Sequence, residues 1–98
     1  MAAETGTNLR IRQHELTWRS VAGEIVALDL RSSTYFTTNA SGADLWMALV
    51  EGSTAQQLTA LLVTTYEISE AQAACDAAAF VKLLESSNLL ERSAEPTA

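Results

Sequence analysis

Several residue types are scarce in this 98-residue sequence, and each scarcity excludes a kind of site. A single cysteine, Cys75, and a single histidine, His14, exclude an intrachain disulfide, a redox pair and a Cys/His metal site. The four glycines are separated from one another, so the sequence has no glycine-rich phosphate loop. We therefore expect no catalytic residue, no metal and no cofactor, with His14 facing solvent on a strand and Cys75 acting as a small apolar helix residue.

Basic residues are also scarce, since six Lys and Arg stand against twelve Asp and Glu and the formal net charge is −6. Phosphate-binding proteins need the opposite sign, because Lys and Arg must displace counterions. Nucleic acid and anionic membrane are therefore excluded as preferred partners. There is also no stretch of about 18 apolar residues and no apolar signal-peptide core. These observations predict a cytoplasmic protein.

The residues that are present have the composition of one folded domain. Hydrophobic residues make up 48% and charged residues 18% of the chain, as in globular proteins. Both ends are small and polar, which predicts a flexible N-terminal tail over residues 1–8 and a flexible C-terminal tail over residues 92–98. The domain itself is expected over residues 9–91.

The first half of this domain has strand patterns. Apolar residues at Leu9 and Ile11 and then at Leu16 and Trp18 differ in parity, which predicts a bulge, bend or break near residues 13–15.

Two further strands follow. Turn residues at 21–23 precede a β-rich run at 24–30, which predicts a hairpin. Residues 34–38 are all β-branched or aromatic and predict a third strand. In an antiparallel meander this third strand would be an open edge, unless the N-terminal segment covers it.

Three helices are predicted after residue 38, because apolar residues then recur at helical spacing behind helix-start signals. Gly52 is placed to end the first helix, and Asn88 to end the third, over residues 70–87, with left-handed backbone. The fold class is therefore α+β, a three-stranded antiparallel sheet followed by three helices in a winged-helix-like order. The start signals are Asn39 or Ser41 for the first helix, Thr54 with Gln57 for the second and Ser69 with Gln72 for the third.

The third helix is apolar over an unusually wide face. Ala79 and Leu83 extend this face beyond the inward stripe, with Phe80 at the border. The extra width indicates a second contact, either with a partner or with a tail of the same chain. The predicted inward stripe is Ala74, Ala77, Ala78, Val81 and Leu84.

The carboxylates give no acid/base pair, because they are scattered over different elements. Asp44 is expected in the first turn of its helix, where a negative charge is favourable. Most of the others are expected to be solvated surface groups. The four considered are Asp29, Asp44, Asp76 and Glu85.

Residues 23–30, 34–43 and 45–46 together resemble the PqqD-like family, and the similarity extends over about residues 18–91. Two positions depart from the family pattern: Thr38 stands where leucine is usual, and Asn88 where glycine is usual. Later residues with the same resemblance are 51–54, Leu58, Leu62, Tyr66, Asp76, Phe80, Leu84 and 89–90.

This resemblance implies a recognition element for ribosomally synthesised, post-translationally modified peptides. Such domains bind the leader of a precursor peptide as a strand added to their third strand, against their third helix, and present it to modifying enzymes. Carried onto this sequence, the peptide-binding residues are Thr34, Tyr35, Phe36, Thr37, Thr38, Gln72, Asp76, Ala79, Phe80 and Leu83.

The resemblance also suggests partners. A stand-alone protein that brings a precursor to the leader peptidase or cyclase of a lasso-peptide pathway is favoured. The alternatives are a carrier protein of pyrroloquinoline quinone biosynthesis and, from another class, a winged-helix transcription regulator, which the acidic charge disfavours. The chain is expected to be a monomer or a weak or strand-swapped dimer. The sequence leaves open whether Tyr35 or Phe36 faces the peptide.

Overall fold

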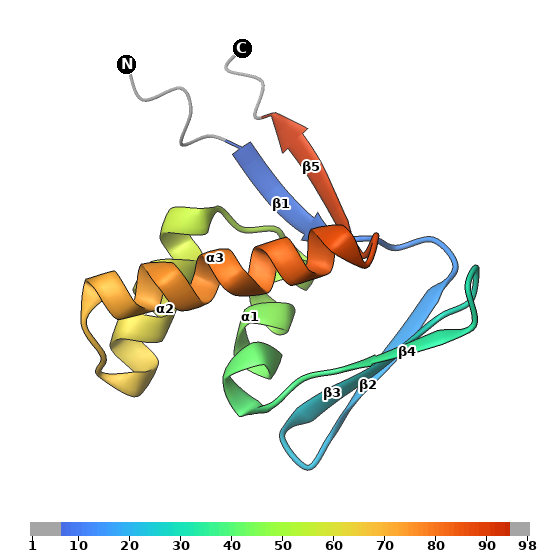
Figure 1. Ribbon diagram of the computed structural model, residues 1–98, viewed down its shortest axis with the longest axis horizontal. Coiled ribbons are helices and arrows are strands. Elements are labelled where there is room, and N and C mark those ends of the chain that lie inside the picture. The colour runs from blue at the N-terminus through green and yellow to red at the C-terminus, as the bar shows by residue number, and fades with distance from the viewer. Residues whose placement is uncertain (1–6, 95–98) are drawn as a thin grey trace.

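The computed structural model describes residues 7–94 (Figure 1). It confirms the α+β class, with a three-stranded antiparallel sheet followed by three helices. The arrangement is winged-helix-like only loosely, because β1 and β5 form a second small sheet. The elements are β1 (Thr7–Ile11), β2 (Leu16–Val21), β3 (Glu24–Asp29), β4 (Thr34–Thr37), α1 (Ala40–Glu51), α2 (Ala55–Tyr66), α3 (Glu70–Ser86) and β5 (Leu90–Ala94).

The three-stranded sheet has the order β2-β3-β4. The predicted hairpin is confirmed: β2 and β3 are joined at Ala22 and Gly23, whose φ angles of 55° and 82° suit a tight turn that follows the strand twist. β4 is antiparallel to β3 and, within the described residues, has no strand on its other side. The predicted open edge is therefore present.

The predicted change near residues 13–15 is a break between β1 and β2, where Glu15 has a φ of 55°. β1 is not part of the larger sheet. It pairs antiparallel with β5, from Thr7 with Ala94 to Ile11 with Leu90, and the two form a two-stranded ribbon. Sequence analysis missed this ribbon, because the Leu-Glu-Arg-Ser-Ala of β5 has no apolar alternation. The N-terminal segment thus pairs with β5 and leaves β4 open.

The ribbon reaches into the segments that were expected as tails. β1 begins at Thr7 and β5 ends at Ala94, while the remaining predicted tail residues, 1–6 and 95–98, lie outside the described residues. The base of the ribbon is fixed to the body where Leu9 and Ser53 exchange two backbone hydrogen bonds of 2.7 and 2.9 Å. This contact orients β1 against the start of α2.

The caps of α1 and α2 agree with the sequence patterns. Of the two candidates for α1, Asn39 is the cap, and its side chain accepts a hydrogen bond of 2.9 Å from the Gly42 N–H. Gly52 ends α1 with a φ of 101°. The capping box of α2 is complete, with Thr54 and Gln57 exchanging two bonds of 3.1 Å.

The start of α3 is capped by Ser69, which accepts a 3.1 Å hydrogen bond from the Gln72 N–H. The Gln72 side chain donates forward to Asp76 Oδ1 at 2.8 Å instead of back to the cap. Asn88 has a φ of 59°, which confirms the predicted left-handed residue behind the helix. None of the helices within residues 7–94 is long and apolar enough to cross a membrane.

The predicted inward stripe of α3 is wrong in two positions. The buried residues recur at i, i+4, i+8 and i+11, whereas Ala74 and Ala78 are exposed. Residues 73, 74, 77 and 78 are all alanine, so the sequence pattern could not show whether 73 and 77 or 74 and 78 face the core. The buried residues are Ala73, Ala77, Val81 and Leu84.

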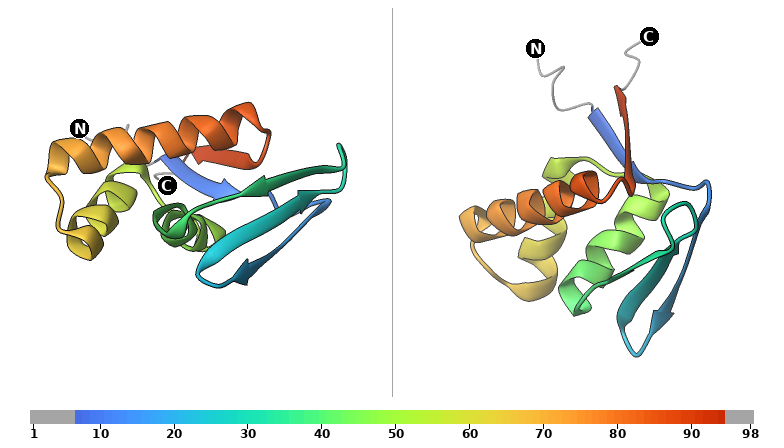
Figure 2. Two further views of the ribbon diagram at one scale, coloured as in Figure 1. Left: turned by 60° about the horizontal axis from the view of Figure 1, so that its bottom comes forward. Right: turned by 45° about the vertical axis from the view of Figure 1, so that its right-hand side comes forward.

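The core lies between the helices and one face of the larger sheet, and the helices gather on that side (Figure 2). Trp46 of α1 is at its centre with no exposed surface. The ring of Trp18 meets it edge-on, with centroids 6.0 Å apart, and the ring of Phe36 stacks on it at 5.7 Å. Trp46 thus contacts one aromatic ring from β2 and one from β4, and these contacts hold α1 against the sheet.

Candidate functional site

β4 is the strand of the larger sheet that lies nearest α3 (Figure 2). Its side chains alternate between two faces of the sheet. Phe36 is half-buried against Trp46, whereas Tyr35 is 69% exposed on the opposite face. Phe36, and not Tyr35, therefore faces the helices.

The side of α3 that faces β4 is apolar with one carboxylate. Leu83 is 49% exposed, and it lines the larger pocket together with Ala79, whose small side chain leaves space above the helix. Phe80 is half-buried, with its ring centroid 6.4 Å from that of Phe36. Asp76 lies one turn earlier and accepts the Gln72 hydrogen bond. The wide apolar face predicted for α3 is thus an exposed surface beside β4.

A pocket of about 350 Å³ lies at the C-terminal end of β4. Gly42 of α1 forms part of it, and a Cβ there would lie 2.9 Å from Thr38 Cβ and 3.2 Å from Phe80 Cε1. Glycine therefore lets α1, β4 and α3 meet at this point. The pocket is lined by Thr37, Thr38, Asn39, Ser41, Gly42, Leu45, Asp76, Ala79, Phe80 and Leu83.

A second pocket, of about 200 Å³, lies at the N-terminal end of β4. It is bounded by the β3–β4 connection on one side and by residues just after α3 on the other. Together the two pockets flank β4 along its length, and we call them the β4–α3 groove. The second pocket is lined by Asp29, Ser32, Thr34, Tyr35, Phe36, Ser87 and Leu89.

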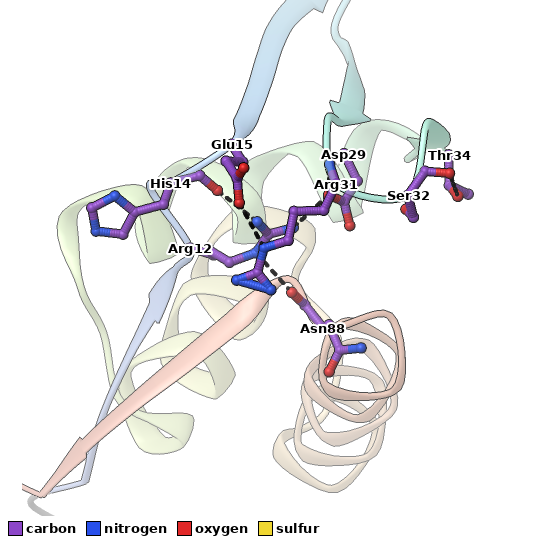
Figure 3. Close-up of polar contacts among 8 residues, drawn as sticks. All are labelled: Arg12, His14, Glu15, Asp29, Arg31, Ser32, Thr34 and Asn88. Atoms are coloured by element: carbon purple, nitrogen blue, oxygen red, sulfur yellow. Dashed lines mark hydrogen bonds and ion pairs between the residues drawn. The ribbon is translucent and has the colours of Figure 1, made fainter.

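Beside the second pocket lies a buried ion pair that the sequence analysis missed (Figure 3). Arg12 is 6% exposed, and its Nη2 lies 2.8 Å from Asp29 Oδ1. Its Nε donates to the Asn88 carbonyl at 3.0 Å and its Nη1 to the His14 carbonyl at 2.5 Å. One side chain thus joins the β1–β2 connection, the end of β3 and the turn after α3.

Most of the carboxylates were expected to be solvated, and Asp29, which is 9% exposed, is an exception. The Arg12 guanidinium lowers the pKa of Asp29 from its ordinary value of 3.8, and the Arg31 backbone N–H acts in the same direction, although burial opposes both. The negative charge is therefore stabilised inside the protein. Asp29 is one of the residues that line the second pocket.

The other carboxylates also differ in detail from expectation. Asp44 lies beyond the first turn of α1 and accepts a 2.5 Å hydrogen bond from the Tyr66 hydroxyl, which raises the pKa of Tyr66. Glu85 forms an ion pair with Arg92. Cys75 is exposed. His14 is exposed as predicted, but it lies in the connection between β1 and β2 and not on a strand.

Nine of the ten residues predicted from the resemblance line one of the two pockets, and Gln72 contacts the groove through Asp76. Their role in binding stays a prediction. The sequence analysis missed eight pocket residues, which come from α1 and from the segments around β4 and after α3. They are Asn39, Ser41, Gly42 and Leu45 in the larger pocket and Asp29, Ser32, Ser87 and Leu89 in the second.

The fold and the groove define a small recognition domain with an open sheet edge beside an apolar helix face. The chain belongs to the PqqD family, since the family model described as coenzyme PQQ synthesis protein D matches residues 24–90. This membership confirms the resemblance read from the sequence.

Two solved structures are similar to this chain over most of their length. The first, TbiB1 in complex with the TbiA(beta) leader peptide, is 26% identical, with 84% of this chain and 94% of that chain covered and a TM-score of 0.77. The second, lasso peptide synthetase B1 complexed with the leader peptide, is also 26% identical, with 85% and 96% covered and a TM-score of 0.75. A comparison with curated proteins found no match.

Proposed function

We propose that this chain binds the leader region of a ribosomally synthesised precursor peptide as a strand added to β4, in the β4–α3 groove. The observation that carries the proposal is the open edge of β4 beside the exposed Leu83 of α3. Edge pairing supplies sequence-independent hydrogen bonds, and pockets beside the edge select side chains. Both similar solved structures are described as complexes with leader peptides, which supports the same use here.

The affinity must come mainly from side-chain anchors, because β4 has only four residues. Each backbone hydrogen bond contributes about 0.5–1.5 kcal/mol net, and ordering a free peptide opposes this. Burying one large apolar side chain contributes about 1.5–3 kcal/mol. We therefore expect an apolar or aromatic leader residue to lie over Ala79 and Leu83 in the larger pocket.

The bound leader then brings the precursor to a modifying enzyme. A leader peptidase or cyclase of a lasso-peptide pathway is favoured, because both similar structures are B1 proteins, and one is called a lasso peptide synthetase. The family description supports the alternative, a carrier protein in pyrroloquinoline quinone biosynthesis. In either pathway the chain acts in the cytoplasm as a non-catalytic peptide chaperone. It acts as a monomer, since a dimer formed through β4 would occupy the edge.

A winged-helix transcription regulator is the candidate from another class. Its recognition helix would be α3, where Lys82 is the single basic residue. A helix with this composition in a chain of net charge −6 would repel phosphate. Binding to duplex DNA that weakens steeply with salt would favour the regulator over the peptide-binding protein.

The test uses fluorescein-labelled synthetic peptides that correspond to the leaders of short precursor genes beside the gene for this chain. Binding is followed by fluorescence anisotropy for the wild type, Leu83→Glu and Ala79→Trp. We expect both variants to bind at least about tenfold more weakly, which is about 1.4 kcal/mol, because one charges and the other fills the larger pocket.

Ala78→Trp is the matched control, because Ala78 is exposed on α3 outside the groove and should leave the affinity unchanged. Circular dichroism checks that every variant remains folded. Unchanged affinity in both Leu83→Glu and Ala79→Trp would remove the groove as the binding site. A set of leaders that all fail to bind the wild type would contradict the function itself.

A further inference from the structure

The second pocket has two walls that come from different parts of the chain. One wall is the end of β3 and the β3–β4 connection, with Asp29 and Ser32, and the other is the segment after α3, with Ser87 and Leu89. Within residues 7–94 no hydrogen bond joins one wall directly to the other. No polar contact across the pocket therefore fixes its width.

Arg12 lies behind the pocket and holds both walls (Figure 3). Its Nη2 pairs with Asp29 at 2.8 Å, and its Nε donates to the Asn88 carbonyl at 3.0 Å. Its backbone N–H also donates to the Leu89 carbonyl, at 2.8 Å. Asp29 in turn accepts a 3.0 Å hydrogen bond from the Arg31 N–H, which fixes the start of the β3–β4 connection. One residue that does not itself line the pocket thus sets the spacing of its walls.

Stability alone does not explain why an arginine is buried here. Removing a guanidinium and a carboxylate from water costs about as much free energy as their attraction returns, and apolar residues of similar volume often stabilise a protein equally well. An arginine adds direction, because its planar guanidinium donates at fixed angles. Arg12 contacts three oxygens in this way, on Asp29, Asn88 and His14. What the buried pair contributes is therefore the placement of the walls.

We infer that Arg12 is a positioning residue for the peptide, because it holds the second pocket at the width that one peptide side chain needs. The inference rests on the proposed function, since it requires a peptide in the β4–α3 groove. It concerns the second pocket alone, because none of the partners of Arg12 lines the larger pocket. Arg12 also lies outside residues 24–90, the part of the chain that matches the family model.

Arg12→Lys is the variant that tests this role. Lysine keeps a positive charge beside Asp29, but its compact ammonium cannot reach the oxygens that the guanidinium contacts through three separate nitrogens. Arg31→Lys is the matched control, because Arg31 forms an exposed ion pair with Glu15 and does not line the pocket. Circular dichroism and urea denaturation check that each variant is folded.

A second variant keeps the test available if Arg12→Lys does not fold. It combines Arg12→Gln with Asp29→Asn, which removes the guanidinium and leaves no unpaired charge in the interior. Asp29→Asn alone is its control, because it changes the pocket lining in the same way and keeps Arg12.

The probe is a short peptide from a random display library, selected on the wild-type chain and kept because it loses binding to Leu83→Glu. Single-alanine variants of this peptide are titrated by isothermal titration calorimetry against the wild type, Arg12→Lys and Arg31→Lys. Ser87→Leu partly fills the second pocket, so the peptide residue whose alanine effect it reduces is the one that this pocket holds. Ala79→Leu identifies the residue in the larger pocket in the same way.

We expect Arg12→Lys to weaken binding of the unchanged peptide about three- to tenfold and to reduce the alanine effect at the second-pocket residue by a similar factor. The alanine effect at the larger-pocket residue should stay within about twofold of its wild-type value, and so should the affinity of Arg31→Lys. A merely structural role gives a different result. A partly unfolded chain loses affinity for every peptide by one common factor, which leaves the alanine effects unchanged.

Unchanged alanine effects in Arg12→Lys would overturn the inference, whether or not the affinity falls. A peptide with no residue that responds to Ser87→Leu would overturn it too, because the second pocket would then hold no side chain. Both results leave the proposed function intact, since the peptide still binds the groove. If no peptide is enriched on the wild type, the proposed function fails, and this inference fails with it.

Discussion

At the residue scale, Gly42 is explained by contact and not by backbone conformation. A Cβ at this position would lie 2.9 Å from Thr38 Cβ, which is attached directly to the backbone and cannot move away independently. Position 42 lies on the buried face of α1, where the sequence alone shows no reason for a glycine. That reason depends on Thr38 and Phe80, which come from two other elements.

We predict that Gly42→Ala lowers the free energy of unfolding by about 1 kcal/mol. Alanine improves helix propensity by about 1 kcal/mol, but overpacking costs about 1–3 kcal/mol and exceeds this gain. Urea denaturation followed by circular dichroism measures the change, with Met47→Ala on the exposed side of α1 as the control. A variant about 1 kcal/mol more stable than the wild type would contradict this prediction, because it would show the gain in helix propensity with no cost from the contact.

The two departures from the family pattern also have residue-scale explanations. Thr38 stands where leucine is usual, and its hydroxyl accepts a 3.2 Å hydrogen bond from the Ile25 N–H at a buried position. Asn88 stands where glycine is usual, and its φ of 59° is one that asparagine tolerates better than most residues. The sequence identified both positions, and the structure shows that a hydrogen bond accommodates Thr38 and a left-handed backbone conformation accommodates Asn88.

At the element scale, the sequence predicted features that neighbouring residues determine, but it did not predict features that depend on residues distant in the chain. The caps at Thr54 and Ser69 were predicted correctly, and that of α1 was narrowed to Asn39 or Ser41, because a cap acts on backbone groups within three residues. The rotational phase of α3 and the existence of β5 were not predicted. Both depend on partners that are distant in sequence, and the alanine-rich α3 and polar β5 carry little pattern of their own.

The phase of α3 can be tested with a pair of adjacent substitutions. Ala73 is fully buried and Ala74 is exposed, so Ala73→Met should lower the free energy of unfolding by about 1–3 kcal/mol through overpacking. Ala74→Met should change it by less than about 0.5 kcal/mol. Thermal and urea unfolding of the two variants give the comparison. Equal effects at the two positions would contradict this phase.

At the scale of the whole molecule, Arg12 joins parts of the chain that no local pattern relates. It contacts Asp29 at the end of β3 and Asn88 after α3, 76 positions away in the sequence. The groove depends on this arrangement, because the second pocket lies between β3–β4 and the residues after α3. Sequence reasoning located most of the groove by resemblance, but it had no means of finding the ion pair beside it.

The ion pair makes stability depend on pH in a defined direction. The pKa of Asp29 is lowered on folding, so its contribution is present above the ordinary value of 3.8 and is lost as the pH falls through the lower folded value. We therefore predict that the urea midpoint of the wild type falls more between about pH 5 and about pH 3 than that of Asp29→Asn.

Glu24→Gln is the control for this measurement, because Glu24 is an exposed carboxylate in the β2–β3 hairpin. Its pH dependence should follow that of the wild type. If Asp29→Asn also follows the wild type over this range, the buried pair does not contribute as described.

The central claim, that a peptide joins the sheet at β4, is tested most directly by amide hydrogen exchange. Exchange is measured by NMR on the ¹⁵N-labelled chain, with and without a peptide that binds it. We predict that the Tyr35 and Thr37 amides, which point to the open edge, gain protection of at least about tenfold, while Phe36, already paired with β3, changes little. New protection along β2 or β5, with Tyr35 and Thr37 unchanged, would contradict the claim.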